Sequence, residues 1–272
     1  MYIYIEIFIL ENTLIHVCIM KKNTVRMDEF SWEEMKELLE NGYNTVVFGI
    51  GATEQHGPAL PLKSDSLQAD ETANLIAKEL PKTLQAPTIL VGYSKYHMNF
   101  PGTITLREST LQAIIEDYID SFAHHGFENI IIYISHGGDV SATEQAIQTK
   151  QAQYPKAKIF YYYTQDAMPV LSTFAQEMQL SPGALGGHAD HREASMILLF
   201  NESLVNKQRL LKGYTGNPNA EIHEKMHSEG TESVSKNGIL GDQRGASKEF
   251  GEKYLKLLKP VMMNYIKKKL ED

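Results

Sequence analysis

The chain has 272 residues, enough for one large domain or two small ones, and 42% of them are hydrophobic, as in an ordinary folded protein. Acidic residues outnumber basic ones and give a formal charge of −8, which argues against nonspecific nucleic-acid binding. Cys18 is the single cysteine, so a disulfide within the chain and a cysteine-based zinc site are both excluded. We therefore expect a cytoplasmic protein with no nucleic-acid partner.

The first nineteen residues form an apolar segment that Glu6 and Glu11 interrupt. No basic region precedes this segment, so it fits a signal peptide poorly. The two carboxylates also make it a poor membrane span, because a span needs about 20 mostly apolar residues. We expect residues 1–19 to be an N-terminal extension or an added strand, with no membrane partner. Residues 20–272 then form a single domain.

Helical and strand-like patterns alternate along the next part of the chain. One helix opens with a capping box, in which Ser31 precedes Glu34 by three residues, and ends near Gly42. Another helix has Ser66 as its expected N-cap. The expected helices are 31–42, 66–80, 109–125 and 140–154. The expected strands, each a short apolar run, are 44–50, 85–91, 129–135 and 157–163.

The C-terminal part of the chain is less regular. A helix is expected at 189–200, a Gly-rich polar stretch spans 213–245, and a final amphipathic helix covers 246–270. Strands that alternate with helices indicate βαβ units. The expected fold class is therefore α/β, with helices on both faces of a mainly parallel sheet.

Residues of metal-ligating types follow two of the expected strands. Glu54 and His56 come after strand 44–50, in "GIGATEQHGPALPLKSD", and His136 follows strand 129–135, in "ISHGGD". Ligands bind beyond the carboxyl ends of the strands in such sheets, so both loops should open on the same edge. Glu54 and His56 are two residues apart, and an extended backbone would point both side chains the same way.

Two further segments supply carboxylates. Asp65 comes just ahead of the next expected helix, where it could bridge two cations. In "HADHREAS", His188 and Glu193 are five residues apart on one expected helix. Glu193 lies among apolar neighbours, where a carboxylate must be paired, hydrogen-bonded or bound to a metal.

Together these residues make two imidazoles and three carboxylates, a set that suits Zn²⁺, Mn²⁺ or Fe²⁺. Five such ligands with one bridging carboxylate fit a site for two ions about 3.5–4 Å apart. Each residue also has a plainer interpretation: a loop glutamate or histidine is most often solvated, Glu193 could be a salt-bridged helix carboxylate, and "HGG" could be a tight turn or a phosphate loop. The joint pattern favours the metal site, because three segments must fall at one edge of the sheet.

Several motifs resemble those of the creatininase (creatinine amidohydrolase) family. "GIGATEQHGPALPLKSD" resembles the family signature G-S-x-E-Q-H-G-P-H-L-P-x-x-T-D, and "YSKYHMNFPGTITL" resembles S-x-x-H-x-x-F-P-G-T. "ISHGGD" and "HADHREAS" are similar to N-G-H-G-G-N and H-A-G-E-x-E-T-S, and "NGILGDQRGAS" is similar to a segment around G-x-x-G-D-P. These motifs occur in family order over residues 30–250.

The resemblance implies a three-layer αβα sandwich with a central, mostly parallel sheet. It implies a hydrolase that uses divalent metal ions, two per chain, to cleave a nonpeptide or cyclic amide C–N bond in a small-molecule substrate. It also implies a homo-oligomer, for which a hexamer is common in the family. By position, Glu54, His56, Asp65 and His136 match the family's metal ligands, with Asp65 as the bridge.

The sequence departs from the creatinine hydrolases of this family at two informative places. In creatinine hydrolases a metal carboxylate lies two residues after the loop histidine, where this chain has Gly138. We therefore expect Glu193 to complete the second metal site, with Asp139 as the alternative. Those enzymes also enclose their substrate with tryptophans, whereas the single tryptophan here is Trp32, in the helix before the first strand. This disfavours creatinine as the substrate. Other family members deformylate a pyrimidine or trim peptides, so the substrate class stays open.

In the expected mechanism a metal-bridging hydroxide attacks the amide carbonyl, and His188 protonates the leaving nitrogen. Glu193 could share this catalytic role if it is not a ligand. Ser94, His97 and Asp139 are expected to line the substrate pocket. The alternative function is a catalytically impaired family member that binds a metabolite or regulates another protein. The altered "ISHGGD" and "HADHREAS" segments favour that alternative, and the retained ligand set favours the enzyme.

Overall fold

A parallel four-stranded sheet forms the centre of the protein. The computed structural model describes residues 23–163, 168–181, 183–216 and 219–272; the segment 1–19 lies outside the described residues. The strand order is β2-β1-β3-β4, and every neighbouring pair is parallel. The strands of this sheet are β1 (Thr45–Ile50), β2 (Thr83–Gln85), β3 (Asn129–Ile134) and β4 (Lys158–Tyr163).

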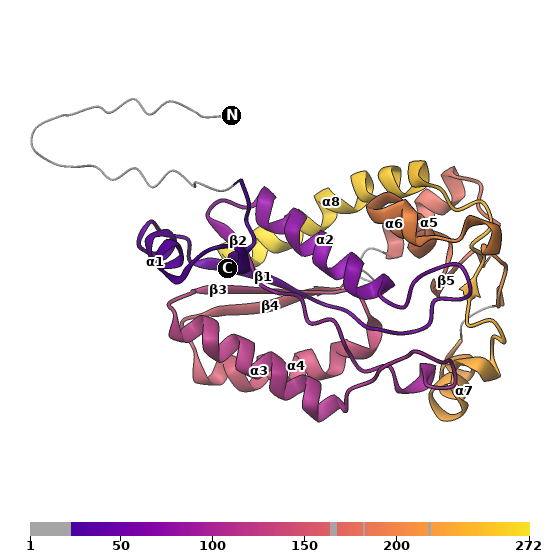
Figure 1. Cartoon of the computed structure of the whole chain (residues 1–272), viewed down its shortest axis with the longest axis horizontal. Coiled ribbons are helices and arrows are strands. Elements are labelled where there is room, and N and C mark those ends of the chain that lie inside the picture. Colours follow the sequence, from indigo (N-terminus) through magenta and orange to yellow (C-terminus); the bar gives the residue numbers. More distant parts are fainter. Residues whose placement is uncertain (1–22, 164–167, 182, 217–218) are drawn as a thin grey trace, which may run out of the picture.

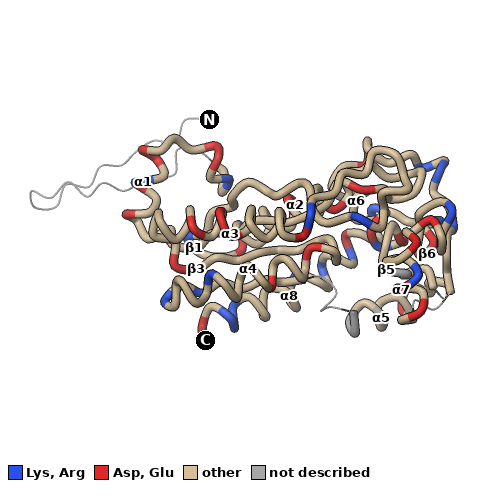
Figure 2. Tube along the Cα trace, turned by 90° about the horizontal axis from the view of Figure 1, so that it is seen from below, with Lys and Arg blue, Asp and Glu red and all other residues tan. Residues whose placement is uncertain are grey.

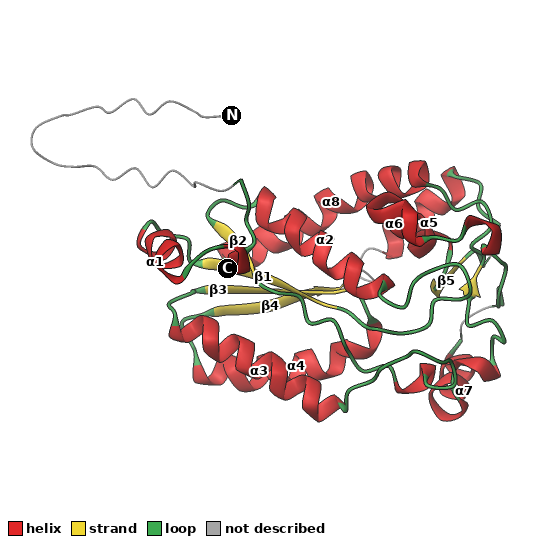
Figure 3. Ribbon diagram, viewed as in Figure 1, coloured by secondary structure: helices red, strands yellow, loops and turns green. Residues whose placement is uncertain are grey.

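Helices cover both faces of this sheet. α2 (Ser64–Glu79) and α8 (Lys248–Glu271) lie on one face, and α3 (Glu108–His124) and α4 (Val140–Gln153) lie on the other (Figures 1 and 3). The expected three-layer α/β sandwich is therefore confirmed.

The strand sequences explain why both faces are covered. Side chains alternate between the faces of a strand. In β3, Ile131 and Tyr133 are buried in the apolar cluster that contains residues of α2 and α8, whereas Ile130, Ile132 and Ile134 are buried in the cluster that contains residues of α3 and α4. A strand that is apolar at nearly every position, as β3 is, needs a layer of helices on each face.

Two expected boundaries were wrong. Helix α2 begins at Ser64, and its N-cap is Lys63, which makes no side-chain cap. Ser66 lies inside the helix, where its hydroxyl donates to the Lys63 carbonyl, so it is not the N-cap. The strand expected at 85–91 is also displaced, since β2 ends at Gln85 and only an isolated bridge at Ile89 follows. Pro87 lies between them and has no N–H to donate to a sheet.

The expected capping box is present at α1 (Trp32–Glu40). Ser31 Oγ accepts from the Glu34 backbone N–H at 3.2 Å, and the Glu34 carboxylate accepts from the Ser31 N–H at 2.7 Å. This helix lies at the end of the molecule away from β5 and α7 (Figure 1). The short 3₁₀ turns are Met27–Glu29, Lys95–His97, Gly137–Asp139, Glu202–Leu204, Lys207–Arg209 and Thr231–Ser233.

The C-terminal part adds elements near the carboxyl ends of the central strands (Figure 1). A small antiparallel sheet pairs β5 (Leu185–His188) with β6 (Leu240–Gly241). α6 (His191–Asn201) corresponds to the expected helix 189–200, and α8 to the expected helix 246–270. The sequence did not predict β5, β6, α5 (Met168–Glu177) or α7 (Ala220–Glu229).

Charged residues of both signs are interspersed along the described chain (Figure 2). Among the described residues, no helix combines the length and the apolar character that a membrane crossing requires.

Candidate metal centre

Four polar side chains meet at the carboxyl edge of the sheet. Glu54 and His56 lie in the loop after β1, Asp65 lies in the first turn of α2, and His136 follows β3. All four are at most 5% exposed. The sequence placed Asp65 ahead of the helix, whereas the earlier start of α2 places it inside. The three segments therefore converge, as the parallel sheet predicts.

His56 points its Nε2 atom at two carboxylates. Its Nδ1 lies 3.1 Å from the Glu54 backbone carbonyl. A carbonyl only accepts, so in the neutral ring the hydrogen is on Nδ1 and Nε2 carries a lone pair. This Nε2 lies 3.4 Å from Asp65 Oδ1 and 3.5 Å from Glu193 Oε2.

His136 is held in the opposite tautomer. Its Nε2 lies 3.0 Å from the Tyr93 carbonyl, so Nε2 donates, and in the neutral ring Nδ1 carries the lone pair. This Nδ1 lies 3.4 Å from Glu54 Oε1 and 3.6 Å from Asp65 Oδ2. Asp65 thus turns one oxygen toward each histidine. Metal-ligating histidines usually have the far nitrogen held in this way.

Buried polar atoms normally have hydrogen-bond partners. Here, however, four buried atoms of the converging residues have none: Glu54 Oε1, Glu54 Oε2, His56 Nε2 and Asp65 Oδ2. The histidine nitrogens and carboxylate oxygens lie 3.4–3.6 Å apart. A tetrahedral ion with bonds of about 2.0–2.1 Å holds neighbouring ligand atoms roughly 3.3 Å apart, which is close to these separations. The residues fit divalent cations in both chemistry and spacing.

The electrostatics of the cluster favour added positive charge. Burial opposes the charged form of His56, but Asp65 and Glu193 outweigh it and raise the pKa of His56 to about 10. Burial likewise opposes protonation of His136, and Glu54 and the other carboxylates raise its pKa to about 9. Burial raises the pKa of Glu54 above its usual value. Protons or cations can therefore supply the charge that these carboxylates attract.

Glu193 comes to the cluster from the start of α6. Its Oε1 accepts from Arg192 Nη2 at 2.8 Å, and its Oε2 accepts from the Ala189 N–H at 2.6 Å. Ala189 has a φ of 51°, which is uncommon for a residue other than glycine. This turn separates His188, the last residue of β5, from α6. The expectation that His188 and Glu193 share one helix was therefore wrong.

Comparison with known proteins places the chain in a family. The family model described as "Creatininase: Creatinine amidohydrolase" matches residues 28–265. The chain belongs to the creatininase family. A relative, the mycofactocin precursor peptide peptidase of Mycolicibacterium smegmatis, is 31% identical over 213 residues, which cover 76% of this chain and 78% of the relative.

Solved creatininase structures share the fold of this family member. "Creatininase Mn" has a TM-score of 0.77 at 22% identity and covers 90% of this chain and 98% of its own. A mutant creatininase of the "Zn-Zn type" has a TM-score of 0.75 at 22% identity, covering 91% of this chain and 98% of its own.

Gly138, the position at which we expected creatinine hydrolases to carry a metal carboxylate, has no room for a side chain. A Cβ at this position would lie 2.3 Å from the Tyr93 carbonyl and 2.5 Å from His136 Nε2, so no longer side chain fits. The neighbouring Asp139 is buried, and its Oδ1 accepts from the Tyr93 N–H at 2.8 Å. Burial raises the pKa of Asp139 to about 7. Glu193, rather than Asp139, lies within 3.5 Å of the bare His56 nitrogen.

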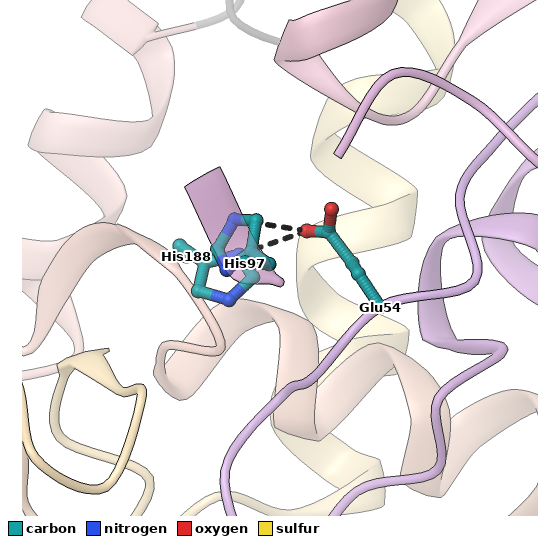
Figure 4. A group of neighbouring side chains, drawn as sticks. All are labelled: Glu54, His97 and His188. Atoms are coloured by element: carbon teal, nitrogen blue, oxygen red, sulfur yellow. Dashed lines mark ion pairs between the residues drawn. The ribbon is translucent and has the colours of Figure 1, made fainter. Parts of the chain in front are cut away.

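Two further histidines face Glu54 from the other side (Figure 4). His97 Nε2 and His188 Nδ1 lie 3.4 and 3.5 Å from Glu54 Oε1. Burial, followed by the charges of neighbouring histidines, lowers the pKa of both rings well below the usual value. Both are therefore neutral near pH 7. Ser94 is fully buried, and its hydroxyl favours the charged form of Glu54.

The structure also brings in residues to which the sequence assigned no role. Gln55 contacts both His97 and His188. The sequence could have pointed to it, since it lies in the matched "TEQHGP" motif. Arg192 pairs with Glu193. It occupies a variable position of the family motif, so the motif gave no reason to single it out. Tyr96 Oη lies 3.4 Å from His136 Nε2, and nothing in the sequence pointed to it.

Proposed function

We propose that this creatininase-family chain is a metal-dependent amidohydrolase with two divalent cations. Glu54, Asp65 and His136 would hold the first ion. His56 and Glu193 would hold the second, with Asp65 shared between the two. The observation that carries the proposal is the convergence of buried ligand atoms that have no hydrogen-bond partner.

The charge around the centre supports two ions. The buried carboxylates there are those of Glu54, Asp65, Asp139, Asp190 and Glu193. Arg192 supplies the guanidinium beside them. Two divalent cations would leave this group of side chains close to neutral, which reduces the cost of burying it. The mixed nitrogen and oxygen ligands suit Zn²⁺, Mn²⁺ or Fe²⁺, and the solved structures named for manganese and zinc agree with this choice.

The bound ions would supply an acidified water, the proposed nucleophile, and a Lewis acid for the amide carbonyl. The chain's own residues handle the protons and the substrate. His188, neutral and facing the centre through Nδ1, would carry a proton to the leaving nitrogen. Ser94, His97 and Asp139 would line the substrate site around it.

We propose a nonpeptide or cyclic amide of a small molecule as the substrate. Creatinine is disfavoured, because Trp32 is 76% exposed on α1 and no other tryptophan is available to enclose it. A peptide amide is the second candidate, and the 31% identity to a precursor peptide peptidase favours it. A homo-oligomer in the cytoplasm remains part of the proposal.

Metal analysis and a substrate screen test this proposal. Purified protein should hold close to two ions per chain, whereas an impaired, metabolite-binding member should hold none. His136→Ala should lose metal and hydrolysis of any active compound among formamides, lactams, cyclic ureas and short peptides. His125→Ala, an exposed histidine at the end of α3, is the matched control and should keep both. A His136→Ala protein with full metal and activity would refute the assignment.

A further inference from the structure

The Gln55 side chain lies between His97 and His188, and two backbone contacts fix its orientation. The Gly57 N–H donates to Gln55 Oε1 at 3.0 Å, and Gln55 Nε2 donates to the Gly238 carbonyl at 3.0 Å. Because an N–H only donates and a carbonyl only accepts, these contacts settle which end of the amide is oxygen and which is nitrogen. Gln55 is 5% exposed, so water does not compete for these bonds.

One hydrogen of the amide is left for two imidazoles. Gln55 Nε2 lies 3.0 Å from His97 Nδ1 and 2.8 Å from His188 Nε2. An amide nitrogen has two hydrogens, and the Gly238 carbonyl takes one of them. Only one of the two rings can therefore accept from Gln55.

The backbone carbonyl of Gln55 determines which of the two rings accepts the remaining amide hydrogen. The Gln55 carbonyl lies 3.0 Å from His188 Nε2 and only accepts, so His188 carries its hydrogen on Nε2. The remaining amide hydrogen then goes to His97 Nδ1, which places the hydrogen of His97 on Nε2. Thr231 Oγ1, 3.2 Å from His97 Nδ1, is a hydroxyl that can donate to the same nitrogen.

We infer that Gln55 is a positioning residue that fixes the tautomers of this histidine pair. As a result, His97 presents an N–H at Nε2 and His188 presents a bare Nδ1, side by side and both within 3.5 Å of Glu54 Oε1 (Figure 4). The pair thus offers a hydrogen-bond donor for a substrate oxygen beside a base that can take up a proton and return it to the leaving nitrogen. This catalytic consequence rests on the proposed hydrolase function, whereas the tautomers do not.

Solid-state ¹⁵N NMR of histidine-labelled protein tests the inference, because protonated and bare ring nitrogens give well-separated shifts. His97→Gln and His188→Gln spectra assign the signals. In wild-type protein, ion-free and zinc-loaded, both rings should show a protonated Nε2 and a bare Nδ1. A protonated Nδ1 on either ring, or a mixture of tautomers, would overturn the inference. Failure of the wild type to bind zinc would count against the proposed function alone.

Gln55→Glu is the sharper variant, because a carboxylate at this place accepts where the amide donates. His97 should then carry its hydrogen on Nδ1, so that Nδ1 gives the shift of a protonated nitrogen and Nε2 that of a bare one. His188 should keep its hydrogen on Nε2, because Nε2 still donates to the backbone carbonyl of residue 55. Gln243→Glu is the matched control: Gln243 is equally buried but donates to the His56 carbonyl, so both rings should keep their signals. A folded Gln55→Glu protein with His97 unchanged would contradict the inference. If that variant does not fold, Gln55→Met combined with Thr231→Val removes both donors to His97 Nδ1, and His97 should then show a mixture of tautomers.

Discussion

Two carboxylates on helix α2, five residues apart, have opposite surroundings. Asp70 accepts from Arg26 through both oxygens, at 3.0 and 2.7 Å. Gln85 Nε2 and Thr88 Oγ1 donate to the same carboxylate, each at 2.9 Å. Asp65 has no guanidinium near it among the described residues, and its Oδ2 has no hydrogen-bond partner although the residue is only 2% exposed.

The difference separates a structural carboxylate from a binding one. Burial works to raise the pKa of Asp70, but its hydrogen bonds from Arg26 and Thr88 lower it, so the chain itself completes this group. Burial acts on Asp65 as well, and the titratable rings of His56 and His136 are the main groups that offset it. A buried carboxylate whose positive partners are histidines that can lose their protons is suited to hold a cation in their place.

The largest expected effect comes from removing the charge of Asp65. Asp65→Asn should abolish binding of both cations, because this side chain faces both bare histidine nitrogens. The measurement is metal content by plasma mass spectrometry after equilibration with excess zinc and gel filtration. Hydrolytic activity should disappear with the metal.

Asp70→Asn is the matched control on the same helix. It should keep both ions and instead lower the free energy of unfolding by about 1.5–3 kcal/mol, the value of hydrogen bonds to a charged group. Chemical denaturation measures this loss. Equal metal loss in the two variants would erase the distinction between the two carboxylates.

The pairing of Arg192 with Glu193 offers the next largest effect. The Arg192 side chain is 13% exposed and lies 2.8 Å from Glu193 Oε1. In the metal-free protein, Arg192→Met should lower the free energy of unfolding by about 3–5 kcal/mol, because it leaves a buried carboxylate without its partner. Added zinc should restore part of the loss, since a cation at Glu193 replaces the missing charge.

Arg244→Met tests whether this loss reflects burial. Arg244 contacts Asp242 through two nitrogens, at 2.7 and 2.9 Å, but its side chain is 62% exposed. Solvent weakens such a pair, so this variant should lose far less stability than Arg192→Met. Similar losses in the two variants would show that burial is not the deciding factor.

The sequence predicted the sheet and the first two ligand segments for the same reason. Strands 44–50 and 129–135 are apolar at nearly every position, which indicates burial on both faces, and a parallel sheet then fixes where their following loops open. Glu54, His56 and His136 could be brought together by that rule alone.

The remaining features of the site depend on long-range contacts that a local sequence pattern does not predict. β5 has the sequence Leu-Gly-Gly-His, and glycine is depleted in strands, so the strand that positions His188 was not visible. The turn at Ala189 has a positive φ, which the alanine gave no reason to expect. The role of Gln55 depends on the Gly238 carbonyl, 183 residues away. Tertiary packing makes these features, and the motif only marks that Gln55 is there.

The titratable counter-charge of the metal centre predicts a pH dependence that the Asp70 site lacks. In the ion-free protein the pKa of His56 is raised to about 10 and that of His136 to about 9, so both rings hold protons at pH 7. Each ion must displace at least one proton, so each affinity should fall at least about tenfold per pH unit as the pH decreases below about 9. Zinc titration calorimetry at pH 7, in buffers of different ionisation enthalpy, should report at least one proton released per ion, because burial also raises the pKa of the ligand Glu54, to about 8. Zinc binding without proton release would contradict the assignment of these two ligands.

The smallest effect concerns the other end of the sheet. Ser31→Ala removes the capping box of α1, which should cost about 1 kcal/mol of stability, because one backbone N–H at the start of the helix loses its acceptor. The zinc content should stay at the wild-type value, since α1 lies at the end of the molecule away from β5, the strand that ends at His188 (Figure 1). Chemical denaturation measures the loss of stability, and metal analysis of the same sample measures the zinc content. A fall in zinc content in this variant would mean that local stability and metal binding are coupled across the sheet, and the contrast between Asp65 and Asp70 would then need measuring at matched stability.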